Sequence, residues 1–210
     1  MLQFCVEGWV KNKIFMEDIS KITKEELVER VSKCTLCGLC EGRTLAVPGS
    51  GSWNAKVMFV GEGPGKDEDL QGKPFVGAAG KFLTELINSI GMSRDDVYIA
   101  NVVKCRPPNN REPLPEEISA CWPYLERQIN IIKPKLIVTL GRYSMDRFLP
   151  GLKISLAHGN PKRANGVWQE RQVYLPLYHP AVALYDGSKR AVLLEDFKKI
   201  PLILKKLDES

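Results

Sequence analysis

The sequence predicts an α/β fold, built on a parallel sheet that helices cover on both faces. Four apolar runs, at residues 56–60, 97–103, 135–140 and 172–178, alternate with segments of helical pattern. Such alternation is typical of a parallel sheet covered on both faces. Each run ends in a polar or glycine-rich loop, and these loops gather at the edge of the sheet where open α/β sheets bind ligands.

The elements follow in order along the chain. Thr23 and Glu26 fit a capping box that starts the first helix. Pro176 suggests that the fourth strand lies at a sheet edge. Four prolines between residues 104 and 115 exclude regular structure there. The predicted helices occupy residues 24–33, 78–90, 116–132, 142–149 and 188–206, the last of them broken near Pro201.

Length and composition indicate one intracellular domain. A chain of 210 residues with 44% hydrophobic and 26% charged residues suits one well-buried domain, which we place at residues 24–210 behind an N-terminal extension, 1–23. No apolar run approaches the roughly 20 residues of a membrane span. The first 20 residues lack the features of a signal peptide, so we expect a cytoplasmic protein. No segment favours oligomerisation, so we expect a monomer, and nothing indicates contact with a sliding clamp.

Charge is unevenly distributed. The net charge is +5, yet residues 141–206 hold 12 Lys or Arg against five Asp or Glu. A basic C-terminal third favours a polyanionic partner. A solvated helix face would account for the same charges.

The loop at residues 61–77 carries the first candidate site residues. Its five glycines allow close approach of the backbone to a ligand. Glu62 and Phe75 stand among them, although a mere connection would need neither. With Asn101 and His179, which lie at the ends of two further strands, they are expected to face one cleft.

Six cysteines indicate a metal centre. They are Cys5, Cys34, Cys37, Cys40, Cys105 and Cys121. An intracellular chain favours metal binding over disulfides, and Cys34, Cys37, Cys105 and Cys121 are the candidate ligands. Four sulfur ligands suit zinc or an iron–sulfur cluster, and the spacing does not separate the two. Free core cysteines are the alternative. Cys40 is poorly spaced to be a ligand.

Several motifs together resemble the family 4 uracil-DNA glycosylases, iron–sulfur enzymes typical of thermophilic bacteria and archaea. They are GEGPG at 61–65, GKPFVGAAGKFL at 72–83, NVVKCRPPNNREPLPEEISAC at 101–121 and YHPA at 178–181. The resemblance covers about residues 31–205. It implies a three-layer α/β/α sandwich with a four-stranded parallel sheet. It also implies a 4Fe-4S cluster on Cys34, Cys37, Cys105 and Cys121.

The same resemblance implies a DNA-repair activity: uracil is flipped out of DNA and its N-glycosidic bond hydrolysed, which leaves an abasic site. His179 would donate a hydrogen bond to uracil O2 as a neutral imidazole. Glu62 would hold the attacking water and favour the cationic sugar. In the alternative interpretations His179 caps the next helix, and Glu62 pairs with Lys66 or Lys73.

The remaining pocket residues are implied in the same way. Phe75 would stack on the flipped base, or else only pack in the core. Asn101 would read N3–H and O4 with its amide, or else satisfy strand-end backbone groups. Glu68 would exclude the thymine methyl group, while Gly61 and Gly63 allow close approach. The family more often has alanine at the position of Gly63.

DNA is expected to be held through its phosphates, and residues 185–190 to enter the duplex. The candidate contacts are Lys81, Lys162, Arg163, Lys189 and Arg190. Two other classes share some of these features. An iron–sulfur nucleic-acid-binding protein would not need Glu62, Asn101 and His179 at separate strand ends. A zinc-stabilised nucleotide-binding enzyme would need a phosphate loop, but GEGPG lacks the GK[ST] ending.

Overall fold

A computed structural model of the chain describes residues 19–209. Its centre is a six-stranded sheet in the order β1-β3-β2-β4-β6-β5. The strands are β1 Ser50–Gly51, β2 Val57–Gly61, β3 Tyr98–Asn101, β4 Leu136–Leu140, β5 Lys162–Ala164 and β6 Gln172–Leu177. The four central strands are parallel to one another, as predicted.

Two edge strands were not predicted, so the sheet is mixed rather than four-stranded and parallel. β1 and β5 are short and pair antiparallel with β3 and β6. β6, which was predicted at a sheet edge, is therefore an edge strand over only part of its length. β5 pairs only with residues 172–174 of β6, and Pro176 lies beyond that pairing. The missing N–H of Pro176 consequently removes no bond to β5.

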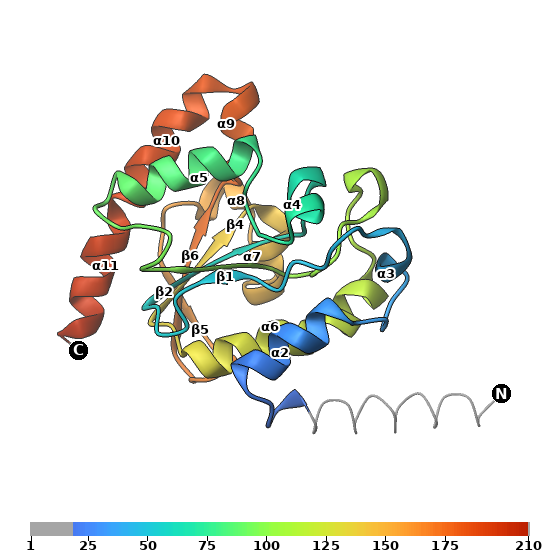
Figure 1. The fold of residues 1–210 in the computed structure, drawn as a ribbon. Coiled ribbons are helices and arrows are strands. Elements are labelled where there is room, and N and C mark those ends of the chain that lie inside the picture. Colours follow the sequence, from blue (N-terminus) through green and yellow to red (C-terminus); the bar gives the residue numbers. More distant parts are fainter. Residues whose placement is uncertain (1–18, 210) are drawn as a thin grey trace.

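Helices cover both faces of the sheet, which gives three layers (Figure 1). One side carries α2 Lys24–Ser32, α6 Pro115–Ile132, α7 Arg142–Phe148 and α8 Ile154–Ala157. The other side carries α5 Ala78–Asn88, α10 Gly187–Phe197 and α11 Lys199–Asp208. The short elements α3 Leu39–Gly42, α4 Lys66–Gln71, α9 Val182–Tyr185 and a 3-10 turn, Pro108–Asn110, lie in the connections.

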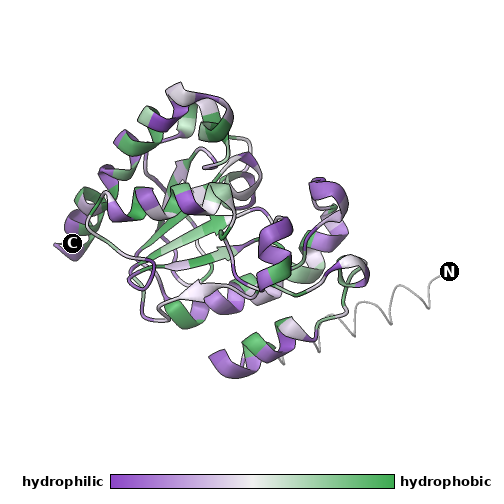
Figure 2. Ribbon diagram, turned by 45° about the horizontal axis from the view of Figure 1, so that its top comes forward, coloured by the Kyte–Doolittle hydropathy of each residue, from purple (hydrophilic) through white to green (hydrophobic). Residues whose placement is uncertain are grey.

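The core has two halves because alternate strand residues face opposite sides. Met58 and Val60 pack with α2 and α6, whereas Val57 and Phe59 pack with α5 and α10. Figure 2 shows the strands as hydrophobic and the helices as two-sided, with hydrophilic residues outward. No helix within residues 19–209 is long and apolar enough to cross a membrane.

The N-terminal helix joins this core. Its predicted capping box is confirmed: Glu26 N donates to Thr23 Oγ1, and Thr23 N donates to Glu26 Oε2. Ile19 and Ile22, at the end of the predicted extension, are buried, and Arg127 Nε donates to Ile22 O at 3.0 Å. The rest of the extension, with Cys5, lies outside the described residues.

The loop predicted at residues 61–77 contains a helix, so that prediction was incomplete. Gly65 precedes α4 and Gly72 ends it with φ of 66°, a conformation that favours glycine. The chain leaves β2 for β3 on one side and later passes to β4 on the other. This topological switch point puts the ligand crevice at the carboxyl ends of β2 and β4.

Candidate active site

A pocket of about 400 Å³ opens at the carboxyl ends of the parallel strands. Six of the residues predicted for the catalytic and substrate site line it: Glu62, Gly63, Glu68, Phe75, Asn101 and His179. They come from the segment after β2, from α4, from the α4–α5 connection, from the end of β3 and from the segment after β6, so the topology brings together residues far apart in sequence. Their chemical roles stay predictions.

Glu62 follows the last residue of β2 and is half-buried. Burial is the main cause that raises its pKa to about 7; nearby Glu112 raises it further and Arg142 lowers it. Glu62 forms no ion pair with Lys66 or Lys73 within residues 19–209. The alternative that it only neutralises a neighbouring lysine is therefore not supported.

His179 follows β6 and reaches the pocket over the end of β4. Gly141 has a φ of 93°, and a Cβ there would come within 3.1 Å of His179 Cβ, so a glycine clears this path. Ala181 N donates to His179 Nδ1 at 3.2 Å. The proton of the neutral ring is therefore on Nε2. Burial lowers the pKa of His179 to about 4, against an opposing effect of Glu68.

Phe75 is held in an unusual backbone conformation. Its φ is 53°, which costs energy for a residue with a side chain. Arg94 fixes this turn, because its guanidinium donates to Phe75 O at 3.1 Å and to Pro74 O at 2.7 Å. The Phe75 ring lies 5.5 Å from the His179 ring. A Cβ at Gly61 would meet Phe75 Cζ at 2.7 Å, which explains a glycine there.

Asn101 ends β3 with a free acceptor. Its side chain is buried, and Oδ1 has no hydrogen-bond partner in the described structure. Buried polar atoms normally have partners, so an unpaired one in a pocket suggests a missing ligand. The alternative in which Asn101 satisfies strand-end backbone groups with this oxygen is not supported.

Glu68 has a local structural contact as well as a place in the pocket. Its Oε1 accepts hydrogen bonds from Val76 N at 3.0 Å and Gly77 N at 3.1 Å. These N–H groups precede α5 and would otherwise lack partners. The second oxygen lies close to Gly65, where an added Cβ would be 2.7 Å away.

Several residues near the pocket were not predicted from sequence. Pro107, Asn110 and Arg111 line it from the proline-rich segment after β3. Glu112 and Arg142 act on Glu62 electrostatically. The only sequence signal available for them was their position after the second and third predicted strands.

A second cavity gathers the cysteines between α3, α6 and the segment after β3. Its lining includes all four predicted ligands, Cys34, Cys37, Cys105 and Cys121, together with Cys40. Within residues 19–209, no three or more His, Cys, Asp or Glu side chains form a group that could hold a metal ion. The structure thus brings the thiols to one cavity without showing a metal centre.

The surroundings of these sulfurs suit anionic thiolates. Arg43 Nη1 donates to Cys105 Sγ at 3.0 Å, and Lys104 N donates to Cys121 Sγ at 3.2 Å. Burial nevertheless raises the pKa of Cys121 to about 12. Thiolates here need a cation, and such N–H donors are those that surround the sulfurs of iron–sulfur clusters. The donor set fits the predicted cluster.

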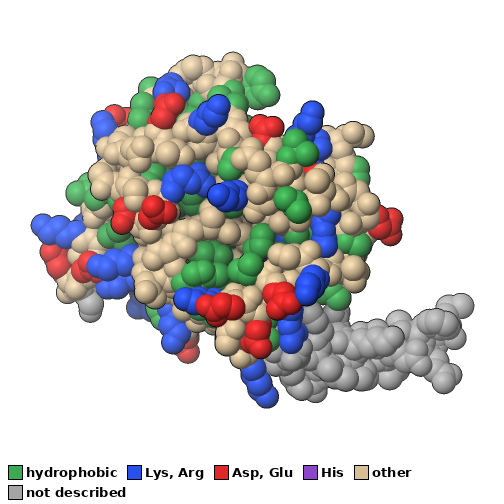
Figure 3. Space-filling model, in the orientation of Figure 1, with side chains coloured by type: hydrophobic (Ala, Val, Ile, Leu, Met, Phe, Trp, Pro, Cys, Tyr) green, Lys and Arg blue, Asp and Glu red, His purple; other side chains and the backbone are tan. Residues whose placement is uncertain are grey.

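The predicted DNA contacts are divided between two places. Lys81 is exposed on α5, and Lys189 Nζ lies 4.7 Å from the centre of the Tyr178 ring. Arg190 pairs with Glu85. Lys162 and Arg163 instead line a groove beside α11, next to the amino end of β6 and away from His179. Figure 3 shows acidic and basic side chains mixed on the face it presents.

The segment predicted to enter the duplex is partly helical. Residues 185–190 join α9 to α10, and Asp186 caps α10 by accepting from Ser188 N. Tyr185 is 90% exposed at this junction. A large, exposed ring at this point is available for contact with a ligand.

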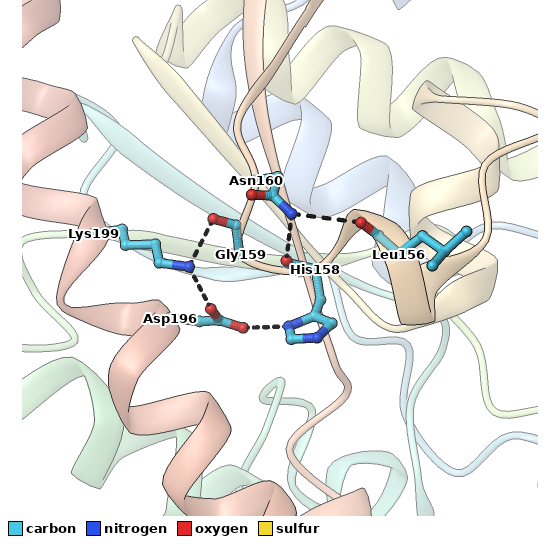
Figure 4. A network of polar contacts seen from close by, with 6 residues as sticks. All are labelled: Leu156, His158, Gly159, Asn160, Asp196 and Lys199. Atoms are coloured by element: carbon cyan, nitrogen blue, oxygen red, sulfur yellow. Dashed lines mark hydrogen bonds and ion pairs between the residues drawn. The ribbon is translucent and has the colours of Figure 1, made fainter.

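His158, the second histidine, lies outside the pocket and ties the end of β6 to α10. Its Nδ1 is 2.7 Å from Asp196 Oδ2, and Lys199 Nζ donates to Asp196 Oδ1 and to Gly159 O (Figure 4). The His158 ring also packs 4.5 Å from the Tyr178 ring. This network thus supports Tyr178, the residue that precedes His179.

The fold and the pocket define an α/β protein that binds its ligand at the carboxyl ends of parallel strands, and residues 48–201 match the model of the uracil DNA glycosylase superfamily. The chain belongs to this superfamily. It is 51% identical over 181 residues to the "Type-4 uracil-DNA glycosylase" of Sulfurisphaera tokodaii, covering 84% of this chain and 82% of the relative. It is 47% identical over 192 residues to the enzyme of that name from Thermotoga maritima, covering 88% and 98%. The resemblance to the family 4 enzymes is confirmed.

A more distant relative has a different type number. The "Type-5 uracil-DNA glycosylase" of Pyrobaculum aerophilum is 35% identical over 153 residues, covering 64% of this chain and 65% of the relative. The type-4 relatives are thus more similar over more of the chain.

Proposed function

We propose that this chain excises uracil from DNA by hydrolysing the bond between N1 of the base and C1′ of the sugar. The observation that carries the proposal is the meeting of Glu62, Asn101 and His179 in one pocket at three strand ends. A protein that only bound nucleic acid would not need this convergence. The base lies inside the duplex, so it must be flipped out before the reaction.

His179 stabilises the leaving uracil. Negative charge grows on O2 as the bond breaks, and a donor aimed at that oxygen favours the transition state. The Ala181 N–H bond to Nδ1 leaves the proton on Nε2 for this purpose. The low pKa keeps the ring neutral at neutral pH, so His179 acts as a neutral hydrogen-bond donor.

Glu62 acts on the sugar side of the bond. Its carboxylate favours the oxocarbenium-like sugar and orients the attacking water, from which it can take the proton. A pKa of about 7 suits such a base, because it is partly ionised and still basic at neutral pH.

The base is recognised between Phe75 and Asn101. The Phe75 ring stacks on uracil, Asn101 Oδ1 accepts from N3–H, and the Asn101 amide donates to O4. Cytosine presents the opposite pattern at these atoms and would leave polar groups unpaired. Glu68 excludes the thymine methyl group, while Gly61 and Gly63 leave room for the base.

Cys34, Cys37, Cys105 and Cys121 hold a 4Fe-4S cluster in this proposal, and zinc is the competing metal. The cluster would be structural, since it joins the N-terminal segment to α6 and to the segment after β3. Iron and sulfide analysis of the purified protein, with its absorption spectrum, tests this. A colourless protein that contains zinc would exclude the cluster.

Phosphate contacts from Lys81, Lys189 and Arg190 hold the DNA near the pocket, and Tyr185 enters the duplex. Lys162 and Arg163 lie farther away and would contact only a longer duplex. Binding by several phosphate contacts falls steeply with salt, so equal affinity at low and high salt would contradict this. A monomer in the cytoplasm remains our expectation, and contact with a sliding clamp is left open.

The decisive experiment uses uracil-containing single- and double-stranded oligonucleotides, followed by alkali to cleave abasic sites. The wild-type chain should produce alkali-labile sites only at uracil. Glu62→Gln and His179→Ala should each lower the single-turnover rate, the latter by about 10²–10³. An unchanged rate for Glu62→Gln would remove this residue from the mechanism, and the absence of cleavage by the wild type would refute the function.

A further inference from the structure

Lys104 is a buried cation between the uracil pocket and the cysteine cavity. Its side chain is only 1% exposed. Nζ donates to Asn101 O at 2.8 Å and to Gln128 Oε1 at 2.7 Å. Both acceptors are neutral, and Lys104 forms no ion pair with a carboxylate in the described part of the chain. A buried ammonium without a counter-charge is costly.

The acceptors of this ammonium are themselves fixed. Gln128 is fully buried, and its Nε2 donates to Pro48 O at 2.6 Å and to Tyr98 Oη at 3.0 Å. These bonds orient the amide so that Oε1 faces Lys104. The ammonium therefore has a defined position, and so does the Asn101 carbonyl that it holds.

The backbone of Lys104 faces the cysteines. Its N–H donates to Cys121 Sγ at 3.2 Å, Cys105 is the next residue, and Lys104 lines the same cavity. Four thiolates outweigh the positive charge of an iron–sulfur core, so a bound cluster is a net anion. It would be the counter-charge that the neutral acceptors do not supply.

We propose that Lys104 is a positioning residue for base recognition. Its ammonium holds the backbone of Asn101, and the net negative charge of the cluster keeps the ammonium in place. The inference rests on the proposed roles of Asn101 and of the cysteine-bound cluster. It gives the cluster an electrostatic connection to the pocket in addition to its structural role.

The test compares Lys104→Met with Lys33→Met. Methionine keeps the length of the side chain and removes the charge and the donors. Lys33 is exposed and also precedes a predicted ligand, Cys34, so it controls for loss of charge in a solvated place. Neither variant is expected to lose iron, and iron content and absorption are measured first.

The first readout is the reduction potential of the cluster, which is measured by spectroelectrochemistry. A nearby buried cation stabilises the reduced, more negative cluster, so Lys104→Met should shift the potential to more negative values. Lys33→Met should shift it much less, because solvent screens the exposed charge. Equal potentials in all three proteins would overturn the link between Lys104 and the cluster.

The second readout is selective binding to DNA that carries 2′-fluoro-2′-deoxyuridine, in which fluorine disfavours the cationic sugar and slows cleavage. Its affinity is compared with that for the same DNA carrying thymine. Lys104→Met should lower this ratio about tenfold, the value of one net hydrogen bond, with unchanged affinity for the thymine DNA. An unchanged ratio would overturn the positioning role.

Lys104→Met could also fail to retain the cluster, and Gln128→Leu then provides the test. It keeps the cation and removes one of the two groups that hold it. The binding ratio should again fall, and an unchanged ratio would overturn the proposal. A wild-type protein without iron, or without preference for uracil DNA, would instead refute the proposed function.

Discussion

The pH dependence of uracil excision should follow the ionisation of Glu62. Burial raises the pKa of this carboxyl to about 7, with a further contribution from Glu112 and an opposing one from Arg142. The proposed reaction needs the ionised form. His179 has a pKa of about 4 and stays neutral above pH 6. Between pH 6 and pH 8, Glu62 is therefore the catalytic group that changes its charge.

The expected size of the pH effect on the excision rate follows from the pKa of Glu62. A group with a pKa near 7 is about 9% ionised at pH 6 and about 91% ionised at pH 8, so the rate should rise about tenfold. Single-turnover excision with excess protein measures it, because product release then does not limit the rate. The profile should level off above pH 8.

Substitutions of two residues near Glu62 test the direction in which the pH profile shifts. Glu112→Gln removes a like charge and should move the rise to lower pH, while Arg142→Gln should move it to higher pH. Both side chains are 63% exposed, so solvent screens them and both shifts should be small. A flat profile in the wild type, or a rise that persists in Glu62→Gln, would refute the assignment.

Three further outcomes follow from the same geometry. Because burial raises the folded-state pKa of Glu62, its ionisation lowers the stability of the fold as pH rises toward 7. Glu62→Gln should therefore raise Tm at pH 8 but not at pH 4. Equal gains in Tm at both pH values, measured by calorimetry, would contradict this. Gly141→Ala forces a Cβ to within 3.1 Å of His179 Cβ at a φ of 93°, so single-turnover excision should fall about 10–100-fold; a wild-type rate would show that His179 is not displaced. Arg94→Met removes the donors that hold the Phe75 turn and should weaken binding of 2′-fluoro-deoxyuridine DNA about tenfold; unchanged affinity measured by anisotropy would show that the turn holds itself.

The four parallel strands could be predicted because buried parallel strands are continuous apolar runs. The helix α4 could not, since Lys66–Gln71 is short and nearly all polar, and its ends depend on Gly65 and Gly72. β1 and β5 are two and three residues long, too short to show alternation. For that reason the antiparallel pairing at both sheet edges could not be predicted from the sequence.

In the pocket, sequence reasoning found the residues at strand ends, where the topology itself brings side chains together. It missed Arg94, Lys104 and Gln128. Each of these long side chains has a hydrogen-bond partner 20 or more residues away: Arg94 donates to Pro74 O, Lys104 to Gln128 Oε1, and Gln128 to Pro48 O. Such partners follow no spacing rule, so only the folded chain reveals them.

The edge strand β5 has a consequence for how copies of the protein behave toward one another. Free strand edges invite pairing between molecules, and lysine or arginine on a short edge strand discourages it. β5 has three residues, and its exposed Lys162 and Arg163 give the edge a positive charge. Removal of these charges should leave excision intact and promote aggregation at high protein concentration. We therefore expect Lys162 and Arg163, first considered for DNA, also to protect the sheet from self-association.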